Sequence, residues 1–346
     1  MAKKNYIHDG INVLKVLSIF GVILFHVSLE YGKYGNPGWL SSMTYTAISR
    51  YCVPVFFMIS GAMILGKNDT IKEFFIKRIN KIFIPLVAWS LIYYFFFSWI
   101  LGKDITIKGI LISLLVKPAA IHLWFLYAII GFYLIAPMYM YIREDKKKII
   151  FAYYTSIWFL IGSLVPFIRV YIPSIPWDLG TPYFYNETYQ LLNYSGYFIA
   201  GYLLLNVTTI RNRSYLSIFT FIASAITMLF LFILDSTKAQ STIQYAGEFR
   251  YPLSAIMAFS IFFLFANKES FHNKKISNII SKIADVTFGI YLCHVIIITG
   301  VVHFIIPILD PSYAIVYIPL LTILIFICGY CFTSLIKKVC FLKKIV

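Results

Sequence analysis

Apolar segments of about twenty residues recur along the whole of this 346-residue chain. A run of this length spans the hydrocarbon core of a bilayer as an α-helix. Hydrophobic residues make up 60% of the sequence and charged residues 13%, and the polar connections are too short for a separate soluble domain. The sequence therefore predicts an all-α polytopic membrane helix bundle, a single domain over residues 1–346. Its ten predicted spans are 11–31, 44–65, 82–101, 122–142, 149–170, 189–207, 215–234, 251–267, 284–308 and 314–336.

Lysine and arginine residues fall mainly in alternate connections between these segments. The side that carries more of them is expected to face the cytoplasm, which places both termini there. The net charge of +16 has this origin, so it gives no reason to expect binding to nucleic acid. The first segment is long enough to span and lacks a cleavage site of small residues, so we expect the chain to retain it.

The first predicted span carries a stripe of polar side chains. Lys15 and His26 are almost three helical turns apart, so they share one face at a separation of about 16 Å. Asn12 lies near that face, and Glu30 follows His26 by one turn. A polar stripe in a membrane helix must face a protein interior or a water-filled cavity. The alternative is that Lys15 reaches the membrane interface and His26 only packs in the core.

These side chains are suited to acid–base chemistry. Histidine titrates near neutrality, so His26 suits the role of general base toward a hydroxyl. Lys15 would favour its neutral imidazole, and Glu30 would orient the ring or stabilise its protonated form. Arg50, inside the second predicted span, suits a developing oxyanion or an anionic donor. A structural ion pair with an acid elsewhere is the alternative for Arg50.

Two amphipathic segments flank the third predicted span. Residues 71–81 alternate apolar and basic positions and predict an interfacial cytoplasmic helix, and residues 105–116 predict a second interfacial or re-entrant helix outside. Arg78 and Lys81, three residues apart on one face, suit the phosphates of a donor such as coenzyme A. Attraction to anionic lipid head groups is the alternative.

Other binding motifs give less information. The sequence has no glycine-rich phosphate loop, no HExxH and no zinc-ligand spacing, so we expect no metal site. The longest outer connection, 171–188, holds Trp177 and Asp178, which suit the stacking and hydrogen bonding of a sugar. An ordinary interfacial belt of aromatic residues is the alternative for this loop.

Five stretches, in order along nearly the whole chain, resemble known family patterns. The first, INVLK at 11–15, is followed by ten residues and then His26. The others are 49–61, KRINKI at 77–82, HLWFL at 122–126 and IYLCH at 290–294. Together they resemble the acyltransferase-3 family of integral membrane acyltransferases, and most closely its standalone enzymes that O-acetylate surface polysaccharides. The chain departs from the family's I-D-x-L-R opening and RxxR segment, with Asn12 in place of the acid and Lys15 and Lys81 in place of arginines.

The resemblance implies a reaction and its participants. Cytoplasmic acyl-CoA, expected to be acetyl-CoA, would bind at Arg78 and Lys81 with help from Lys15. The acyl group would pass to a hydroxyl of an extracytoplasmic or lipid-linked surface glycan, with His26 as the base or as a transient carrier. The substrate-binding candidates are Trp124, His122 and His294. The expected location is the plasma membrane, with the lipid bilayer and other glycan-synthesis proteins as further partners.

Three alternatives stay open from the sequence. A transporter or exporter could use Lys15, His26 and Glu30 as a relay, although neither paired broken helices nor an inverted repeat is evident. The acyl group could be succinyl instead of acetyl. A purely structural subunit of a glycan-synthesis complex is the third alternative, and it would not need buried charge at this spacing.

Overall fold

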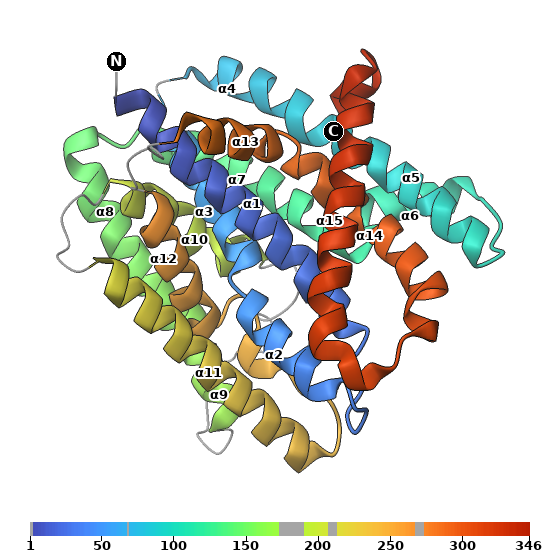
Figure 1. Ribbon diagram of the computed structural model, residues 1–346. Helices are drawn as coiled ribbons and strands as arrows, with labels where there is room; N and C mark the ends of the chain where they lie inside the picture. Colours follow the sequence, from blue (N-terminus) through green and yellow to red (C-terminus); the bar gives the residue numbers. More distant parts are fainter. Residues whose placement is uncertain (1–2, 68, 173–189, 207–212, 267–272) are drawn as a thin grey trace.

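The computed structural model describes residues 3–67, 69–172, 190–206, 213–266 and 273–346. Within these ranges the chain is built from helices and connections, with no strand, so the predicted all-α polytopic bundle is confirmed. The first and last described residues lie at the same end of the bundle, which we call the terminal end (Figure 1). Which side of the membrane this end faces stays a prediction.

The described residues contain nine stretches that are long and apolar enough to cross a membrane. They correspond to nine of the ten predicted spans. The tenth predicted span, 189–207, coincides with α10, which has 16 residues. The helices of the first half are α1 (Lys3–Leu29), α2 (Trp39–Ser49), α3 (Cys52–Ile64), α4 (Ile71–Arg78), α5 (Ile84–Ile100), α6 (Ile107–Leu115), α7 (Trp124–Met140), α8 (Glu144–Ile157) and α9 (Val165–Tyr171). Those of the second half are α10 (Gln190–Leu205), α11 (Arg213–Ala239), α12 (Pro252–Ala266), α13 (Lys274–Ala284), α14 (Thr287–Phe304) and α15 (Ala314–Lys338).

Helices α1, α3, α10 and α12 form the core of the bundle. Helices α3 and α10 cross at very short range because glycines face the backbone of the partner helix. A Cβ atom on Gly61 would lie 1.6 Å from the carbonyl oxygen of Phe198, and one on Gly201 would lie 1.9 Å from that of Met58. Small residues at such crossings let membrane helices approach closely and gain van der Waals contact. Any larger residue at either position would push α3 and α10 apart.

The second predicted span is broken into two helices. We expected one helix over 44–65, but α2 ends at Ser49 and α3 begins at Cys52. Pro54 explains the break, because it has no N–H to donate to the carbonyl of Arg50 and its ring collides with that carbonyl in a continuous helix. The side chain of Arg50 therefore leaves the backbone at an interruption inside the bundle.

Amphipathic helices lie at the terminal end. The predicted helix over 71–81 is present as α4, which continues through a π-helical turn, Ile79–Phe83, into α5. Helix α13 was not predicted, although isoleucines alternate with lysines in it at helical spacing. Its Ser277 hydroxyl donates to the carboxylate of Asp9 at 2.8 Å and so joins α13 to the start of α1. On the far side of α5, the expected helix over 105–116 is α6, which the Thr106 side chain caps at the N–H of Gly109.

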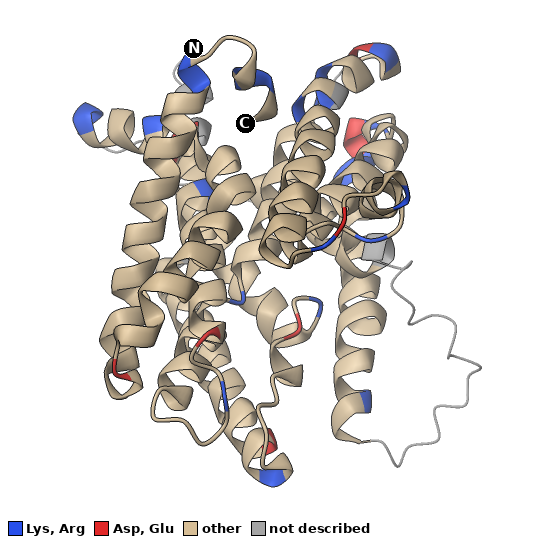
Figure 2. Cartoon of the chain, turned by 90° about the vertical axis from the view of Figure 1, so that its right-hand side faces the viewer, with Lys and Arg blue, Asp and Glu red and all other residues tan. Residues whose placement is uncertain are grey.

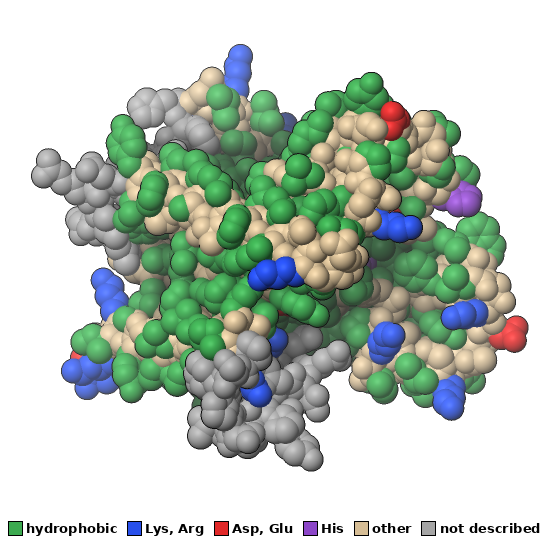
Figure 3. All heavy atoms as spheres, turned by 90° about the horizontal axis from the view of Figure 1, so that it is seen from below, with side chains coloured by type: hydrophobic (Ala, Val, Ile, Leu, Met, Phe, Trp, Pro, Cys, Tyr) green, Lys and Arg blue, Asp and Glu red, His purple; other side chains and the backbone are tan. Residues whose placement is uncertain are grey.

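Charge is distributed unevenly between the two ends of the bundle. Most lysine and arginine side chains lie in the half that holds both termini (Figure 2). The opposite end, seen in Figure 3, is largely hydrophobic and carries isolated charged side chains. This asymmetry follows the alternation of basic connections that the sequence shows.

Candidate functional site

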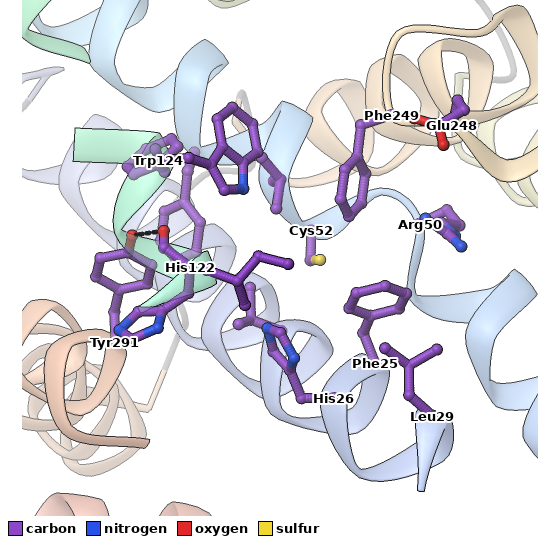
Figure 4. A pocket seen from close by; sticks show the side chains of 15 residues that line it. Phe25, His26, Leu29, Arg50, Cys52, His122, Trp124, Glu248, Phe249 and Tyr291 are labelled. Atoms are coloured by element: carbon purple, nitrogen blue, oxygen red, sulfur yellow. Dashed lines mark hydrogen bonds between the residues drawn. The ribbon is translucent and has the colours of Figure 1, made fainter. Parts of the chain in front are cut away.

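A cavity of about 310 Å³ lies inside the bundle. It is bordered by α1, the break between α2 and α3, the start of α7, the connection before α12, and α14. Four of the predicted site residues line it: His26, Arg50, His122 and Trp124 (Figure 4). The rest of the lining is mainly apolar and aromatic, and includes Phe25, Leu29, Cys52, Val53, Phe56, Phe125, Glu248, Phe249 and Tyr291. A cavity with this lining suits a substrate that is held by few polar groups.

Three histidines meet at one end of this cavity. The ring centroid of His294 lies 5.3 Å from that of His26 and 4.8 Å from that of His122. The Nδ1 atom of His294 lies 2.5 Å from the carbonyl oxygen of Tyr291. Because a carbonyl only accepts, Nδ1 must carry the proton, and Nε2 of His294 is left with a lone pair and no hydrogen-bond partner. His294 itself does not line the cavity, but its ring packs against those of His26 and His122, which do.

The backbone around the histidines is fixed by Tyr291. Its hydroxyl donates to the carbonyl oxygen of His122 at 2.5 Å and so ties α14 to the 3₁₀ turn Ile121–Leu123 that precedes α7. Both ring nitrogens of His122 are buried and make no hydrogen bond of ordinary geometry. Among the residues that the structure describes, no group of three or more His, Cys, Asp or Glu could hold a metal ion. The turn that carries His122 is thus held against α14.

Arg50 lies at the other end of the cavity. Three phenylalanine rings surround its guanidinium carbon, with centroids 4.6 Å away for Phe25, 5.2 Å for Phe249 and 5.9 Å for Phe232. Its Nη2 atom donates to Oε1 of Gln244 at 2.9 Å. Cation–π contacts of this kind stabilise a guanidinium without neutralising its charge. Arg50 therefore directs a positive charge toward the cavity.

The connection that supplies Gln244, Glu248 and Phe249 is held in place by side-chain hydrogen bonds. The hydroxyl of Thr242 donates to the carbonyl oxygen of Gly32 at 2.5 Å. The N–H of Ile243 donates to the hydroxyl of Ser236 at 2.8 Å. Sequence analysis predicted no role for this segment, whose only signal is a short polar stretch between two spans. It contributes Glu248 and Phe249 to the lining at the Arg50 end of the cavity (Figure 4).

Trp124 forms an aromatic wall of the cavity. Its ring lies 5.2 Å from that of Tyr194 on α10 and 6.1 Å from that of Phe57 on α3. Phe57 and Tyr194 stack on each other at 5.2 Å. These contacts fix the indole in one orientation, because its neighbours come from two packed helices of the core. Trp124 is thus a rigid surface against which a flat or extended substrate group can pack.

Lys15 is not part of the cavity. It shares α1 with His26, but its position is about 16 Å closer to the terminal end by helical rise. Its charge interacts with those of Asp285 and Lys81, which come from the α13–α14 connection and from the start of the α5 span. The predicted stripe is therefore divided between two places, with His26 in the cavity and Lys15 nearer the terminal end.

Glu30 lies outside the cavity as well. Helix α1 ends at Leu29, two residues earlier than we expected, and the Glu30 side chain is exposed. It makes no ion pair or hydrogen bond with the described residues. The loop with Trp177 and Asp178 falls outside the described residues.

Arg78 and Lys81 belong to a cationic group at the terminal end. Partial burial and the charge of the neighbouring Arg78 lower the pKa of Lys67, which precedes α4. A hydrogen bond from Lys77 lowers the pKa of Asp69, with Nζ and Oδ1 2.7 Å apart. Arg78 packs over Phe74 and Tyr133. Lys81 is exposed, so its charge is accessible at the terminal end.

The geometry can now be compared with known proteins. The model of a family described as an acyltransferase domain matches residues 8–336. The chain belongs to the acyltransferase-3 family. The match covers both the cavity and the cationic group, so this acyltransferase contains them within the family domain. No curated protein and no solved structure matches the chain. We conclude that the chain is a multi-pass membrane acyltransferase.

Proposed function

We propose that this acyltransferase carries an acetyl group from cytoplasmic acetyl-CoA to a hydroxyl of a surface glycan at the plasma membrane. The acceptor in this proposal is extracytoplasmic or lipid-linked, and other glycan-synthesis proteins would supply it. One observation supports the proposal above all: His26 and His122 line a cavity inside the bundle, and the ring of His294 packs against both. Membrane-buried ionisable side chains are costly and indicate function by default.

The donor would bind from the terminal end. Arg78, Lys81 and Lys67 offer charged donors for the phosphates of coenzyme A. Lys15, between this group and the cavity, would assist the same part of the donor. The long pantetheine arm would then follow α1 and bring the thioester to His26. This arrangement keeps the charged part of the donor near the membrane surface and sends only its neutral end into the bundle.

His26 would act as the general base. The acceptor hydroxyl attacks the thioester carbonyl, His26 takes the hydroxyl proton, and a C–O bond forms as the carbonyl becomes a tetrahedral oxyanion. When this intermediate collapses, the C–S bond breaks and the proton on His26 passes to the leaving thiolate. The products are the ester and coenzyme A, and no further reactant is needed. His122, His294 and Trp124 would hold the two substrates in contact.

The decisive experiment replaces His26 with alanine. We expect ester-linked acetyl on the surface glycan, and acetyl-CoA consumption by the purified protein in lipid nanodiscs, to fall by about 10²- to 10⁴-fold. His303→Ala is the matched control, because His303 also lies on a membrane helix, α14, but is exposed outside the cavity. Equal ester content in wild type and His26→Ala, with both proteins inserted at the same level, would show that His26 is not the base.

A second experiment concerns the donor end. Arg78→Ala should raise the KM for acetyl-CoA and leave the KM for the acceptor unchanged, because the two substrates contact different ends of the bundle. Arg143→Ala is its control, since Arg143 is exposed and pairs with Asp145 at 3.0 Å. An unchanged KM for acetyl-CoA would remove Arg78 from the donor site. If the glycan fails to reach the surface in the His26 variant, the result would instead favour the alternative that the protein exports a glycan.

A further inference from the structure

Arg50 is buried with most of its hydrogen-bonding capacity unused. The residue is 6% exposed. A guanidinium has five N–H donors and no acceptor. The described residues accept one of these, through Oε1 of Gln244, and the buried Nε has no partner. Buried polar groups in folded proteins are nearly always hydrogen-bonded, so the remaining donors call for an acceptor that is not part of the described chain.

The charge of Arg50 is also left without a close counter-ion. The three ion pairs within the described ranges are Lys77–Asp69, Arg143–Asp145 and Lys147–Glu144, and none includes Arg50. Glu248 attracts the guanidinium from further away, but its own side chain is exposed. A buried charge is expensive unless it is paired, and three phenylalanine rings reduce this cost only in part. The site is therefore complete only with an anion.

We propose that Arg50 binds a carboxylate or phosphate group carried by the acceptor. The anion site itself follows from the geometry; its assignment to the acceptor rests on the proposed acyl transfer. The planar guanidinium presents paired N–H groups that match two oxygens of either anion. The acceptor would then lie along the cavity, with its anionic group at Arg50 and its reactive hydroxyl at His26 (Figure 4).

In the proposed reaction, the phosphates of coenzyme A are not the partner of Arg50. Those phosphates have the cationic group at the terminal end, whereas Phe25, which contacts Arg50, is adjacent to His26 in α1 and ten residues beyond Lys15. The part of the donor that reaches His26 is an uncharged thioester. An anion at Arg50 must therefore arrive with the other substrate. The Phe25 ring lies 4.6 Å from the guanidinium carbon of Arg50 and 5.3 Å from the His26 ring, so the two ends of the cavity are close enough for one small sugar unit to meet both.

Neighbouring residues fix the guanidinium for this task. Gln244 holds Nη2, and Gly247 lies directly against Nε, where an added Cβ would be 2.9 Å away. The α2–α3 break caused by Pro54 places the Arg50 backbone inside the bundle. Since the side chain is held from several directions, binding an anion requires no rearrangement of the arginine, which favours affinity.

Binding of simple sugars to the full-length protein in nanodiscs tests this proposal. The probes are methyl β-D-glucuronide and glucose 6-phosphate, with uncharged methyl β-D-glucoside as their control, and the readout is tryptophan fluorescence, since Trp124 lines the cavity. We expect at least one anionic sugar to change the fluorescence saturably, at a Kd about tenfold or more below that of the glucoside. Equal responses to charged and uncharged sugars, or none to either anion, would overturn the proposal.

Variants of Arg50 complete the test. Arg50→Gln should abolish the preference for the anionic sugar, Arg50→Lys should retain part of it, and Arg143→Gln should keep it fully. A preference that persists in Arg50→Gln would refute the role of Arg50, whether or not acyl transfer occurs. If the anionic sugars bind through Arg50 while His26→Ala still forms esters, the anion site stands and the proposed role of His26 fails. The wild-type comparison of charged with uncharged sugars needs no variant, so it decides the matter even if Arg50→Gln does not fold.

Discussion

Two buried cations, Lys147 and Arg50, lie in different parts of this acyltransferase and differ in how many hydrogen-bond and ion-pair partners surround them. Lys147, on α8 at the terminal end, is 1% exposed. Its Nζ atom donates to the carboxylate of Glu144 at 2.5 Å and to the carbonyl oxygen of Leu65 at 3.2 Å. The Tyr202 ring lies 5.6 Å from the ammonium, and the Tyr202 hydroxyl donates to the same carboxylate. Leu65, Glu144 and Tyr202 thus all contribute to stabilising the charge of Lys147.

Arg50 has one neutral hydrogen-bond acceptor and no carboxylate within ion-pair distance among the described residues. Both cations lose their bound water on burial, so each needs other hydrogen-bond acceptors or an opposite charge in its place. Lys147 finds these partners at the end of α3, on α8 and on α10, and thereby joins these helices. Arg50 finds only some of the partners that it needs within the described protein. The hydrogen bonds of Lys147 are made within the protein and hold helices together. The unused donors of Arg50 face a cavity, which supports the proposal that Arg50 binds a ligand.

The largest expected effect on stability comes from Lys147→Met. Loss of a charge-assisted hydrogen bond and of the contact with Leu65 should cost about 2 kcal/mol of unfolding free energy, since the exposed Glu144 can regain water. Arg50→Gln should change stability by about 0.5 kcal/mol or less, because it removes an unpaired charge. Thermal unfolding of the two variants in the same detergent measures this difference. A larger loss in Arg50→Gln than in Lys147→Met would reverse the assignment of the two roles.

A smaller effect is expected from Gly247→Ala. The new Cβ would lie 2.4 Å from the Phe232 ring and 2.9 Å from Nε of Arg50, so the guanidinium must shift. We expect a stability loss of about 1 kcal/mol and weaker binding of methyl β-D-glucuronide, although no charge has been removed. Titration of the variant with this sugar checks the prediction. Wild-type affinity in Gly247→Ala would mean that the fixed position of Arg50 does not matter for binding.

A modest effect, on stability alone, is expected from Tyr202→Phe. This change removes one hydrogen bond to Glu144 but keeps the aromatic ring over Lys147, so it should cost about 0.5 to 1 kcal/mol. Acyl transfer per folded molecule should not change, because Tyr202 lies at the terminal end and outside the cavity. Unfolding temperature and acetyl-CoA consumption measure the two parts separately. A specific loss of transfer would place Tyr202 in the active machinery and weaken the contrast with Arg50.

The helical architecture follows from the sequence because the bilayer fixes the length of an apolar segment. The same reasoning missed the break between α2 and α3, although Pro54 stands four residues after Arg50 and gives a local signal. It also missed α13, although its isoleucines and lysines give the same kind of amphipathic signal as residues 71–81. The early end of α1 has only a weak signal in the sequence, and it is the reason why Glu30 does not continue the stripe.

Part of the candidate site was predictable from residue chemistry and family patterns, not from the length of apolar segments. His26, Arg50, His122 and Trp124 were candidates from their chemistry or from the family patterns, and the structure brings them to one cavity. The contact of Arg50 with Gln244 joins positions that are 194 residues apart, which spacing in a single sequence does not reveal. The separation of Lys15 from the cavity likewise depends on neighbours from α13 and α14, far along the chain.

The interruption at Pro54 has a consequence for how the protein is made. A segment with an arginine near its middle and a proline that removes a backbone hydrogen bond enters the lipid phase at a cost of about 2.5 to 3.5 kcal/mol for the charge alone. Residues 39–64 are also the most enclosed of the nine candidate spans, with 72% of their most apolar window buried. Helix α10, which covers α3 so closely, leaves the ribosome more than a hundred residues later. During synthesis this segment must therefore be sheltered by α1 or by the insertion machinery until its permanent neighbour arrives.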